Sequence, residues 1–160
     1  MGVSECLLED DDAIQALLRR VHRVAVLGIK TEAQADKPAF YVAQYLLAAG
    51  LELVPVPVYY PEVTSILRRP VYRRLRDIPG PVDLVNVFRR PEDLPAHVED
   101  ILEKKPAAVW FQLGISHPQV AERLADAGIQ VVQNRCLLVE HQRWVAAEAV
   151  EGLPQSVLRK

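Results

Sequence analysis

The chain has 160 residues, of which 50% are hydrophobic and 25% are charged, and its formal net charge is -2 at pH 7. This length and composition predict one globular domain with a single substantial core, and they exclude a disordered or fibrous chain. The small net charge argues against a surface built as a whole to bind nucleic acid or an acidic membrane.

Cysteine and histidine spacing gives no sign of a metal or redox site. The two cysteines, Cys6 and Cys136, form no C-x-x-C pair, and the histidines have no ligand spacing to a cysteine or to one another. No signal peptide is visible, and no apolar stretch reaches the roughly 20 residues of a membrane span. We therefore expect a cytoplasmic protein without a metal, with no nucleic-acid or membrane partner. A protein partner or a homo-oligomer stays open.

Along the chain, a helix is expected first, at about 11–20, because an acidic run at 9–12 suits a helix start. Short apolar runs rich in β-branched residues follow, as is typical of strands buried on both faces. The five runs are 24–28, 51–58, 82–88, 107–113 and 129–132.

Three helices are expected between these strands. The first begins at Pro38, in a first-turn position, and ends before Gly50. The second opens at Pro91 and ends at Lys105, and the third is capped by Ser116 and ends before Gly128. The link 59–81 carries several prolines and is expected to be a loop with one short helical turn.

The chain's last part is expected to hold one more helix at 137–147, followed by a frayed tail at 148–160. Residues 1–147 are thus expected to form the single domain. Alternation of strands and helices predicts an α/β fold with a parallel sheet covered on both faces. We expect a Rossmann-like, doubly wound, five-stranded parallel sheet of order 3-2-1-4-5, with ligands bound at the carboxyl ends of the strands.

Those strand ends carry the candidate binding residues. Gly28 precedes a helix start that favours anions, and Lys30, Lys37 and Arg89 lie near the same edge, where cations suit phosphate groups. Gln112 and Gly114 are candidates for the pocket floor. A simple turn glycine, solvated charges and plain core packing remain the alternatives at these positions.

Two common nucleotide-binding patterns are absent. There is no G-x-G-x-x-G, and no acidic residue ends the second strand to hold a ribose, which argues against NAD. There is no G-x-x-x-x-G-K-[ST] either, which argues against ATP or GTP bound in that mode. Cys136 with His141 and Glu140 allows a thiol-dependent enzyme, although a buried structural cysteine is the simpler interpretation.

Several segments taken together resemble a known family. "VAVLGIK", "KPAFYVAQYLLAAGLELVPV", "VWFQLGI" and "NRCLLVEH" occur in an order similar to that of the small single-domain coenzyme A-binding proteins of bacteria and archaea. Those proteins resemble the nucleotide-binding domain of the succinyl-CoA synthetase alpha subunit. The resemblance covers about residues 21–144 and implies a Rossmann-type fold that binds CoA or an acyl-CoA without ligase machinery.

The resemblance also implies roles for residues. Gly28, Ile29 and Lys30 would meet the pyrophosphate, and the end of the second strand would flank the adenine and its phosphorylated ribose. The sequence departs from the family at Lys30, where a small residue is common, and at the end of the second strand, where a basic residue is usual. The remaining candidates are Pro38 at the helix start, Pro57, Val58 and Tyr59 at the second strand end, and Val87 and Phe88 at the third.

The function expected from these features is CoA or acyl-CoA binding by a carrier or regulatory module rather than catalysis. A protein-interaction module that has lost nucleotide binding is the first alternative, and its contact surface would be the arginine-rich stretch 68–76. A thiol-dependent enzyme using Cys136 is the second.

Overall fold

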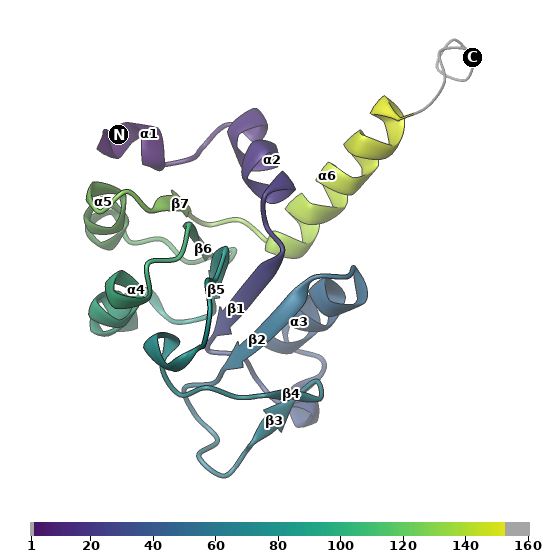
Figure 1. The fold of residues 1–160 in the computed structure, drawn as a ribbon, viewed down its shortest axis with the longest axis vertical. Helices are drawn as coiled ribbons and strands as arrows, with labels where there is room; N and C mark the ends of the chain where they lie inside the picture. Colours follow the sequence, from purple (N-terminus) through teal and green to yellow (C-terminus); the bar gives the residue numbers. More distant parts are fainter. Residues whose placement is uncertain (1, 153–160) are drawn as a thin grey trace.

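In the computed structural model, which describes residues 2–152, five parallel strands form the central sheet (Figure 1). Each strand overlaps one of the apolar runs recognised in the sequence. Their bounds are β1 Arg23–Leu27, β2 Glu52–Val56, β5 Leu84–Val87, β6 Ala108–Phe111 and β7 Gln130–Val132. The expected class, a Rossmann-like α/β fold with a parallel sheet, is therefore confirmed.

The order of the strands differs from the prediction. The sheet runs β2-β1-β5-β6-β7, which is 2-1-3-4-5 when the five strands are counted along the chain, whereas 3-2-1-4-5 was expected. β1 pairs with β2 on one side and β5 on the other, so that Ala25 lies between Val54 and Val85. The predicted order was wrong because it placed β2 inside the sheet.

Pro55 explains why β2 is an edge strand. Proline has no N–H group and cannot complete the ladder of a central strand, so within sheets it is confined to edges. The carbonyl oxygen of Pro55 accepts a hydrogen bond from the backbone of Tyr72 at 3.0 Å, outside the parallel sheet. The chain segment after β2 therefore covers this edge, and β5 must pair with the free side of β1.

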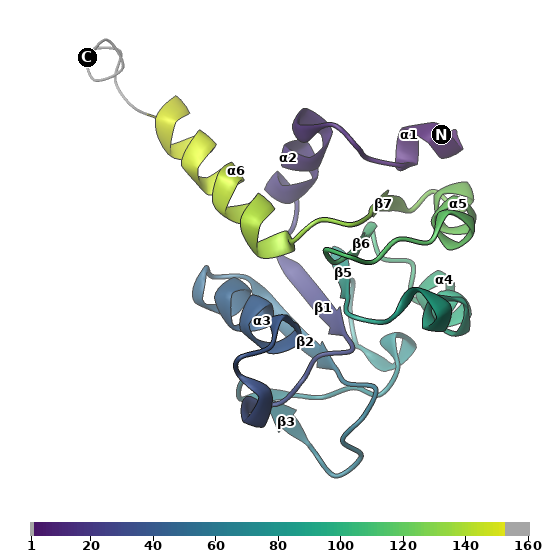
Figure 2. The same ribbon diagram turned by 180° about the vertical axis from the view of Figure 1, so that it is seen from behind.

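Helices cover both faces of the sheet (Figures 1 and 2). One buried cluster joins β1 and β6 to residues of α2, α3 and α6, and a second cluster joins the opposite face to α4 and α5. A further short helix, α1, contacts α5. The helix bounds are α1 Val3–Cys6, α2 Asp11–Arg19, α3 Pro38–Ala48, α4 Val98–Lys104, α5 Pro118–Asp126 and α6 Leu137–Glu151.

Two of the expected helices begin differently. The helix expected from Pro91 starts as a 3₁₀ segment, η3 Pro91–His97, and becomes α-helical only in α4. Pro95 lies within that segment, where its missing N–H prevents regular α-helical bonding. The cap of α5 is His117 rather than Ser116, because the His117 side chain accepts the backbone N–H of Val120 at 3.1 Å.

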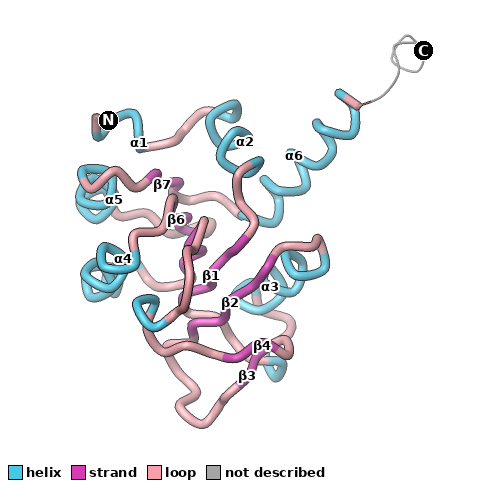
Figure 3. Tube along the Cα trace, viewed as in Figure 1, coloured by secondary structure: helices cyan, strands magenta, loops and turns pink. Residues whose placement is uncertain are grey.

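The link 59–81 contains more structure than a loop with one turn (Figure 3). β3 Ser65–Ile66 and β4 Arg69–Pro70 form a short antiparallel hairpin, and a 3₁₀ turn, η2 Leu75–Asp77, follows. Leu67 and Arg68 make the turn with positive φ values of 52° and 60°. The usual glycine or asparagine of such turns is missing, so the sequence offers no hairpin signal.

The last helix is longer than expected. α6 continues through Glu151, beyond the expected end at Ala147, and its C-terminal part projects away from the sheet (Figure 2). Arg19 of α2 pairs with Glu148 at 2.6 Å and so ties this part of α6 to the domain. The expected tail therefore does not begin at 148, and residues 153–160 lie outside the described part.

Candidate functional site

The carboxyl ends of β1 and β5 mark the point where the chain leaves the sheet in opposite directions. β1 leads to α3 on one face, and β5 leads to η3 and α4 on the other. In doubly wound sheets such a switch point leaves a crevice in which ligands bind. With the strand order found here, the switch point lies between β1 and β5, which are the first and third strands of the sheet along the chain.

A cavity of about 430 Å³ lies at this switch point. We call it the switch-point cavity. It is lined by Lys30, Lys37, Pro38, Ala39, Phe88, Arg89, Arg90, Pro91, Gln112, Leu113, Gly114 and Ile115. The tertiary structure thus brings seven of the predicted residues together from three strand ends and one helix start. They are Lys30, Lys37, Pro38, Phe88, Arg89, Gln112 and Gly114.

A second cavity of about 320 Å³ lies at the ends of β1 and β2, and we call it the β2-end cavity. Pro57 and Val58 line it together with His97 and the arginines at 73, 74 and 76. Arg73 donates to the carbonyls of Tyr59, Tyr60 and Val63, which holds the segment after β2 in place. Two further predicted residues therefore lie beside this cavity rather than the first.

Four predicted residues line neither cavity. Ile29 and Val87 are 1% and 0% exposed, so their side chains belong to the core. Gly28 lies against the backbone of Phe88, and its N–H donates to Val56 at 2.9 Å. Tyr59 is 58% exposed at the molecular surface. Of these four, only Tyr59 presents a side chain to solvent that a ligand could meet.

Arg89 connects the two cavities. Its side chain is 14% exposed and lines the switch-point cavity, while its Nε donates to Nε2 of His97 at 3.2 Å. Its guanidinium also lies 3.4 Å from the Asp93 carboxylate and 3.3 Å from the Tyr59 hydroxyl. The guanidinium is therefore held in place before any ligand binds, with its charge partly balanced by Asp93.

This arginine also sets the ionisation of its neighbours. Its hydrogen bond and its positive charge lower the pKa of the Tyr59 hydroxyl below the ordinary value. Burial, reinforced by the charge of Arg89, lowers the pKa of His97. His97 is therefore neutral near pH 7, which agrees with Nε2 acting as a hydrogen-bond acceptor.

The other cations of the switch-point cavity are less constrained. The Lys30 ammonium has no hydrogen-bond or ion-pair partner among residues 2–152, and Lys37 has only Asp36 at 3.8 Å. Arg90 is exposed and pairs with Asp93 at 3.0 Å. Lysines at the rim of a cavity are free to contact phosphate oxygens at little cost in lost interactions.

The lengthened link between Gly28 and Pro38 is ordered. Thr31 and Gln34 form a capping box around a 3₁₀ turn, η1 Glu32–Gln34, with Thr31 Oγ1 2.7 Å from Gln34 Oε1. The backbone N–H of Lys30 donates to Ala39 at 3.0 Å. These bonds fix the backbone of Lys30 beside the start of α3.

Sequence reasoning missed Asn86 and His97. Asn86 is 0% exposed and donates to the side chain of Gln112 at 3.3 Å. A polar residue inside the apolar run Leu84–Val87 was a visible signal, because a buried polar group needs partners. His97 had no such signal, since only folding places it against Arg89.

The thiol-enzyme alternative gains little from the structure. Cys136 is half-buried and is the N-cap of α6. The His141 Nδ1 atom lies 2.8 Å from the Tyr45 hydroxyl, and the Glu140 carboxylate pairs with Arg143 at 3.2 Å. The side chains expected to serve as base and orienter are thus occupied elsewhere.

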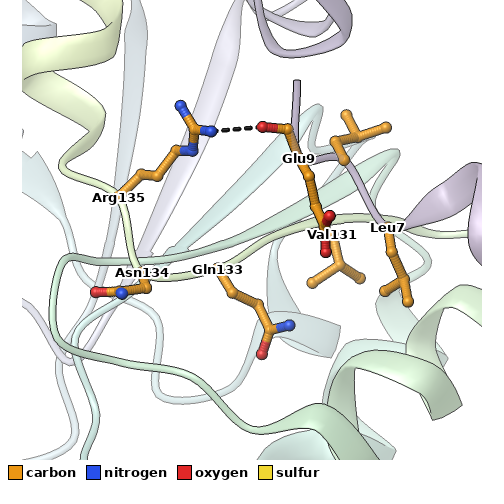
Figure 4. A pocket seen from close by; sticks show the side chains of 7 residues that line it. Leu7, Glu9, Val131, Gln133, Asn134 and Arg135 are labelled. Carbon is orange, nitrogen blue, oxygen red and sulfur yellow. Dashed lines mark hydrogen bonds between the residues drawn. The ribbon is translucent and has the colours of Figure 1, made fainter. Parts of the chain in front are cut away.

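A third cavity, of about 260 Å³, lies at the end of β7 and contains none of the predicted residues (Figure 4). We call it the β7-end cavity. The N-terminal segment closes it, with Arg135 donating to the carbonyl of Glu9. Arg135 also pairs with Asp11 at 3.1 Å. Its guanidinium therefore serves to hold the N-terminal segment.

Metal ligands do not gather within residues 2–152: no group of three or more His, Cys, Asp or Glu side chains is placed to hold an ion. In the same part of the chain, none of the helices combines the length and the apolar character needed to cross a bilayer.

A Rossmann-like domain with a cationic cavity at its switch point defines a nucleotide-binding class of protein. The family model of the CoA binding domain matches residues 22–142, and the chain belongs to this family. The match spans all five strands and the switch-point cavity.

The chain is 33% identical to the Bacillus subtilis (strain 168) protein YneT over 128 residues, covering 80% of this chain and 91% of YneT. A solved Thermus thermophilus structure, cell-free ID.343, is 36% identical with a TM-score of 0.77, covering 85% of this chain and 99% of that one. A dinucleotide-forming acetyl-coenzyme A synthetase of Ca. Korarchaeum cryptofilum shares the fold alone. It has 16% identity and a TM-score of 0.58, and the match covers 69% of this chain and 25% of the synthetase.

Proposed function

We propose that this protein binds CoA at the switch-point cavity as a carrier or regulatory module, without a catalytic step of its own. The observation that carries the proposal is the set of four cationic side chains, Lys30, Lys37, Arg89 and Arg90, lining one cavity at the carboxyl edge of the sheet. Membership of the CoA-binding domain family supports the choice of CoA among phosphorylated ligands.

The order of the strand ends matches the order of groups in CoA. The exposed apolar surfaces of Val58 and Tyr59 after β2 suit the adenine, and Lys30 and Arg89 after β1 and β5 suit the pyrophosphate. The residues after β6 then remain for the pantetheine arm. Because neighbouring strands lie about 4.8 Å apart, an extended ligand can follow the edge from β2 to β6.

The family's usual basic residue at the second strand end is missing here. Arg74 lines the β2-end cavity, and its side chain is 62% exposed. Among residues 2–152 it pairs only with Asp77, at 3.5 Å. It is therefore the side chain best placed to contact the 3′-phosphate of CoA. Arg73 and Arg76 are bound to backbone carbonyls and to Asp100, respectively.

Calorimetric titration with CoA tests the site. Lys30→Ala should weaken CoA binding about tenfold, because a charge-assisted contact contributes about 1.5 kcal/mol. Lys30 suits this test because its ammonium has no partner among the described residues, so its removal breaks no protein contact.

Arg123→Ala is the matched control, since Arg123 is an exposed cation on α5 that pairs with Glu99 and lines none of the three cavities described. It should bind CoA like the wild type. Unchanged affinity in the Lys30→Ala, Lys37→Ala double variant would rule the site out.

A protein-interaction module is the second candidate, and one observation favours it. Arg68 and Arg69 lie exposed at the tip of the β3–β4 hairpin, and neither has a side-chain partner within residues 2–152. A thermal-shift series with CoA, acetyl-CoA, NAD, NADP and ATP separates the candidates. A ligand that binds only the folded state raises Tm, whereas no shift with any of the five favours the interaction module.

A further inference from the structure

The floor of the switch-point cavity holds a buried amide with an unused donor. Gln112 follows β6 directly and is 4% exposed. Its Oε1 atom accepts the backbone N–H of Leu137 at 3.3 Å and the Asn86 side chain at 3.3 Å. Because a backbone N–H can only donate, the oxygen must face α6, and this fixes which way the amide points.

The nitrogen of the same amide is left without a partner. No hydrogen bond from Nε2 occurs to any residue in the described range 2–152, and this nitrogen is not one of the buried unpaired atoms, so it is open to solvent. Because Oε1 faces α6, Nε2 lies on the other side of the amide, where the cavity that Gln112 lines is available to it. A solvent-accessible N–H beside a cavity can donate to a ligand oxygen without breaking a contact within the protein.

The neighbours of Gln112 are mainly apolar. Leu113 is 66% exposed, Ile115 is half-buried, and Pro91 lines the same cavity. A Cβ added to Gly114 would meet no atom within 4 Å, so the space beside the backbone is open. This end of the cavity suits an apolar group that carries one hydrogen-bond acceptor.

We propose that the ligand is an acyl-CoA, and that Gln112 Nε2 donates to its thioester carbonyl while Leu113 and Ile115 contact the acyl group. This inference rests on the proposed CoA site. A neutral amide donor matches a neutral carbonyl oxygen, whereas the thiol of free CoA is a weak acceptor. Gln112 follows β6, which lies two strands from β1 in the sheet. The pantetheine arm therefore spans the distance between the cationic side chains and Gln112.

The test compares acetyl-CoA with S-ethyl-CoA, a thioether in which a methylene replaces the carbonyl, by calorimetric titration of the full chain. Wild-type protein should bind acetyl-CoA about tenfold more tightly than S-ethyl-CoA. In Gln112→Leu the two affinities should become equal, with S-ethyl-CoA bound as in the wild type. Gln142→Leu, an exposed position on α6, is the control and should keep the tenfold preference.

Each other result decides against the proposal. Equal affinities in the wild type overturn it without any variant, so a failure of Gln112→Leu to fold leaves the test intact. If Gln112→Leu weakens both ligands alike, the amide binds a carbonyl of the pantetheine arm instead. If neither analogue nor CoA itself binds the wild type, it is the CoA site that fails.

Discussion

Gly28 directly follows β1 and has a φ of +87°, a conformation that favours glycine. From the sequence, this glycine was a candidate contact for the pyrophosphate. In the structure the close neighbour is the protein itself, because an added Cβ would lie 2.3 Å from the carbonyl oxygen of Phe88. Gly28 therefore lets the end of β1 approach the chain after β5 closely, next to Phe88, which lines the switch-point cavity.

Gly28→Ala should destabilise the fold by about 2–4 kcal/mol, since backbone strain and a clash with a carbonyl add together. Urea unfolding measures the change. Gly128→Ala is the matched control, because Gly128 has a φ of +84° but no atom within 4 Å of an added Cβ. It should lose only about 1 kcal/mol from strain, and equal losses in the two variants would contradict the packing role.

Single residues at strand ends were largely predictable, and their partners were not. Lys30, Arg89 and Gln112 were chosen because ligands bind at the carboxyl ends of parallel strands, and all three line the switch-point cavity. The contact of Arg89 with Tyr59 joins positions 30 residues apart, and that of Gln112 with Leu137 joins positions 25 apart. Such pairs depend on how strands and helices pack, which local sequence does not encode.

At the scale of elements, the packing of α3 against α6 includes a buried histidine. His141 is 5% exposed, and its Nδ1 atom lies 2.8 Å from the hydroxyl of Tyr45. Burial lowers the pKa of His141, and the pKa of His97 is lowered as well. Both side chains are therefore neutral in the folded state at a pH where the unfolded chain begins to bind protons.

This difference predicts the pH dependence of stability. The unfolded state binds more protons than the folded state below the ordinary histidine pKa of about 6.5, so the free energy of unfolding should fall as the pH drops from 7.5 to 5.5. Chemical denaturation at several pH values measures the slope. The His97→Gln, His141→Gln double variant should show a shallower slope over this range, and an unchanged slope would contradict the assignment.

Prediction of elements succeeded where the pattern is periodic and failed where it is not. The start of α3 at Pro38 followed from the first-turn preference of proline. The β3–β4 hairpin was missed because Leu67 and Arg68 adopt left-handed conformations without a turn signal. Pro95 divided an expected helix into 3₁₀ and α segments, a signal present in the sequence but not used.

At the scale of the whole molecule, both edges of the sheet are covered. The segment 71–72 lies along β2, and Leu8 donates to the carbonyl of Val131 in β7 at 2.9 Å. Covered edges prevent pairing with other chains. Arg135 holds the N-terminal segment by donating to the carbonyl of Glu9 (Figure 4). It also pairs with the Asp11 carboxylate.

Arg135→Met should therefore loosen the N-terminal segment while leaving the switch-point cavity intact. Hydrogen exchange of the Leu8 amide should become faster. The hydrogen bond from this amide to Val131 opens more often when Arg135 no longer holds the N-terminal segment. Arg74→Met is the control, since Arg74 pairs with Asp77 and lines the β2-end cavity, which contains no residue of the N-terminal segment. Exchange of Leu8 at the wild-type rate in Arg135→Met would show that the segment is held by other contacts.

By itself, the sequence determined the α/β class, the positions of the five strands and the residues at their carboxyl ends. These features depend on apolar runs, caps and prolines, which act locally along the chain. Only the tertiary structure decided the strand order, because pairing depends on which strand edges are free, and Pro55 leaves β2 at the edge. That order places the ends of β1, β5 and β6 side by side, and so brings Lys30, Arg89 and Gln112 around one cavity.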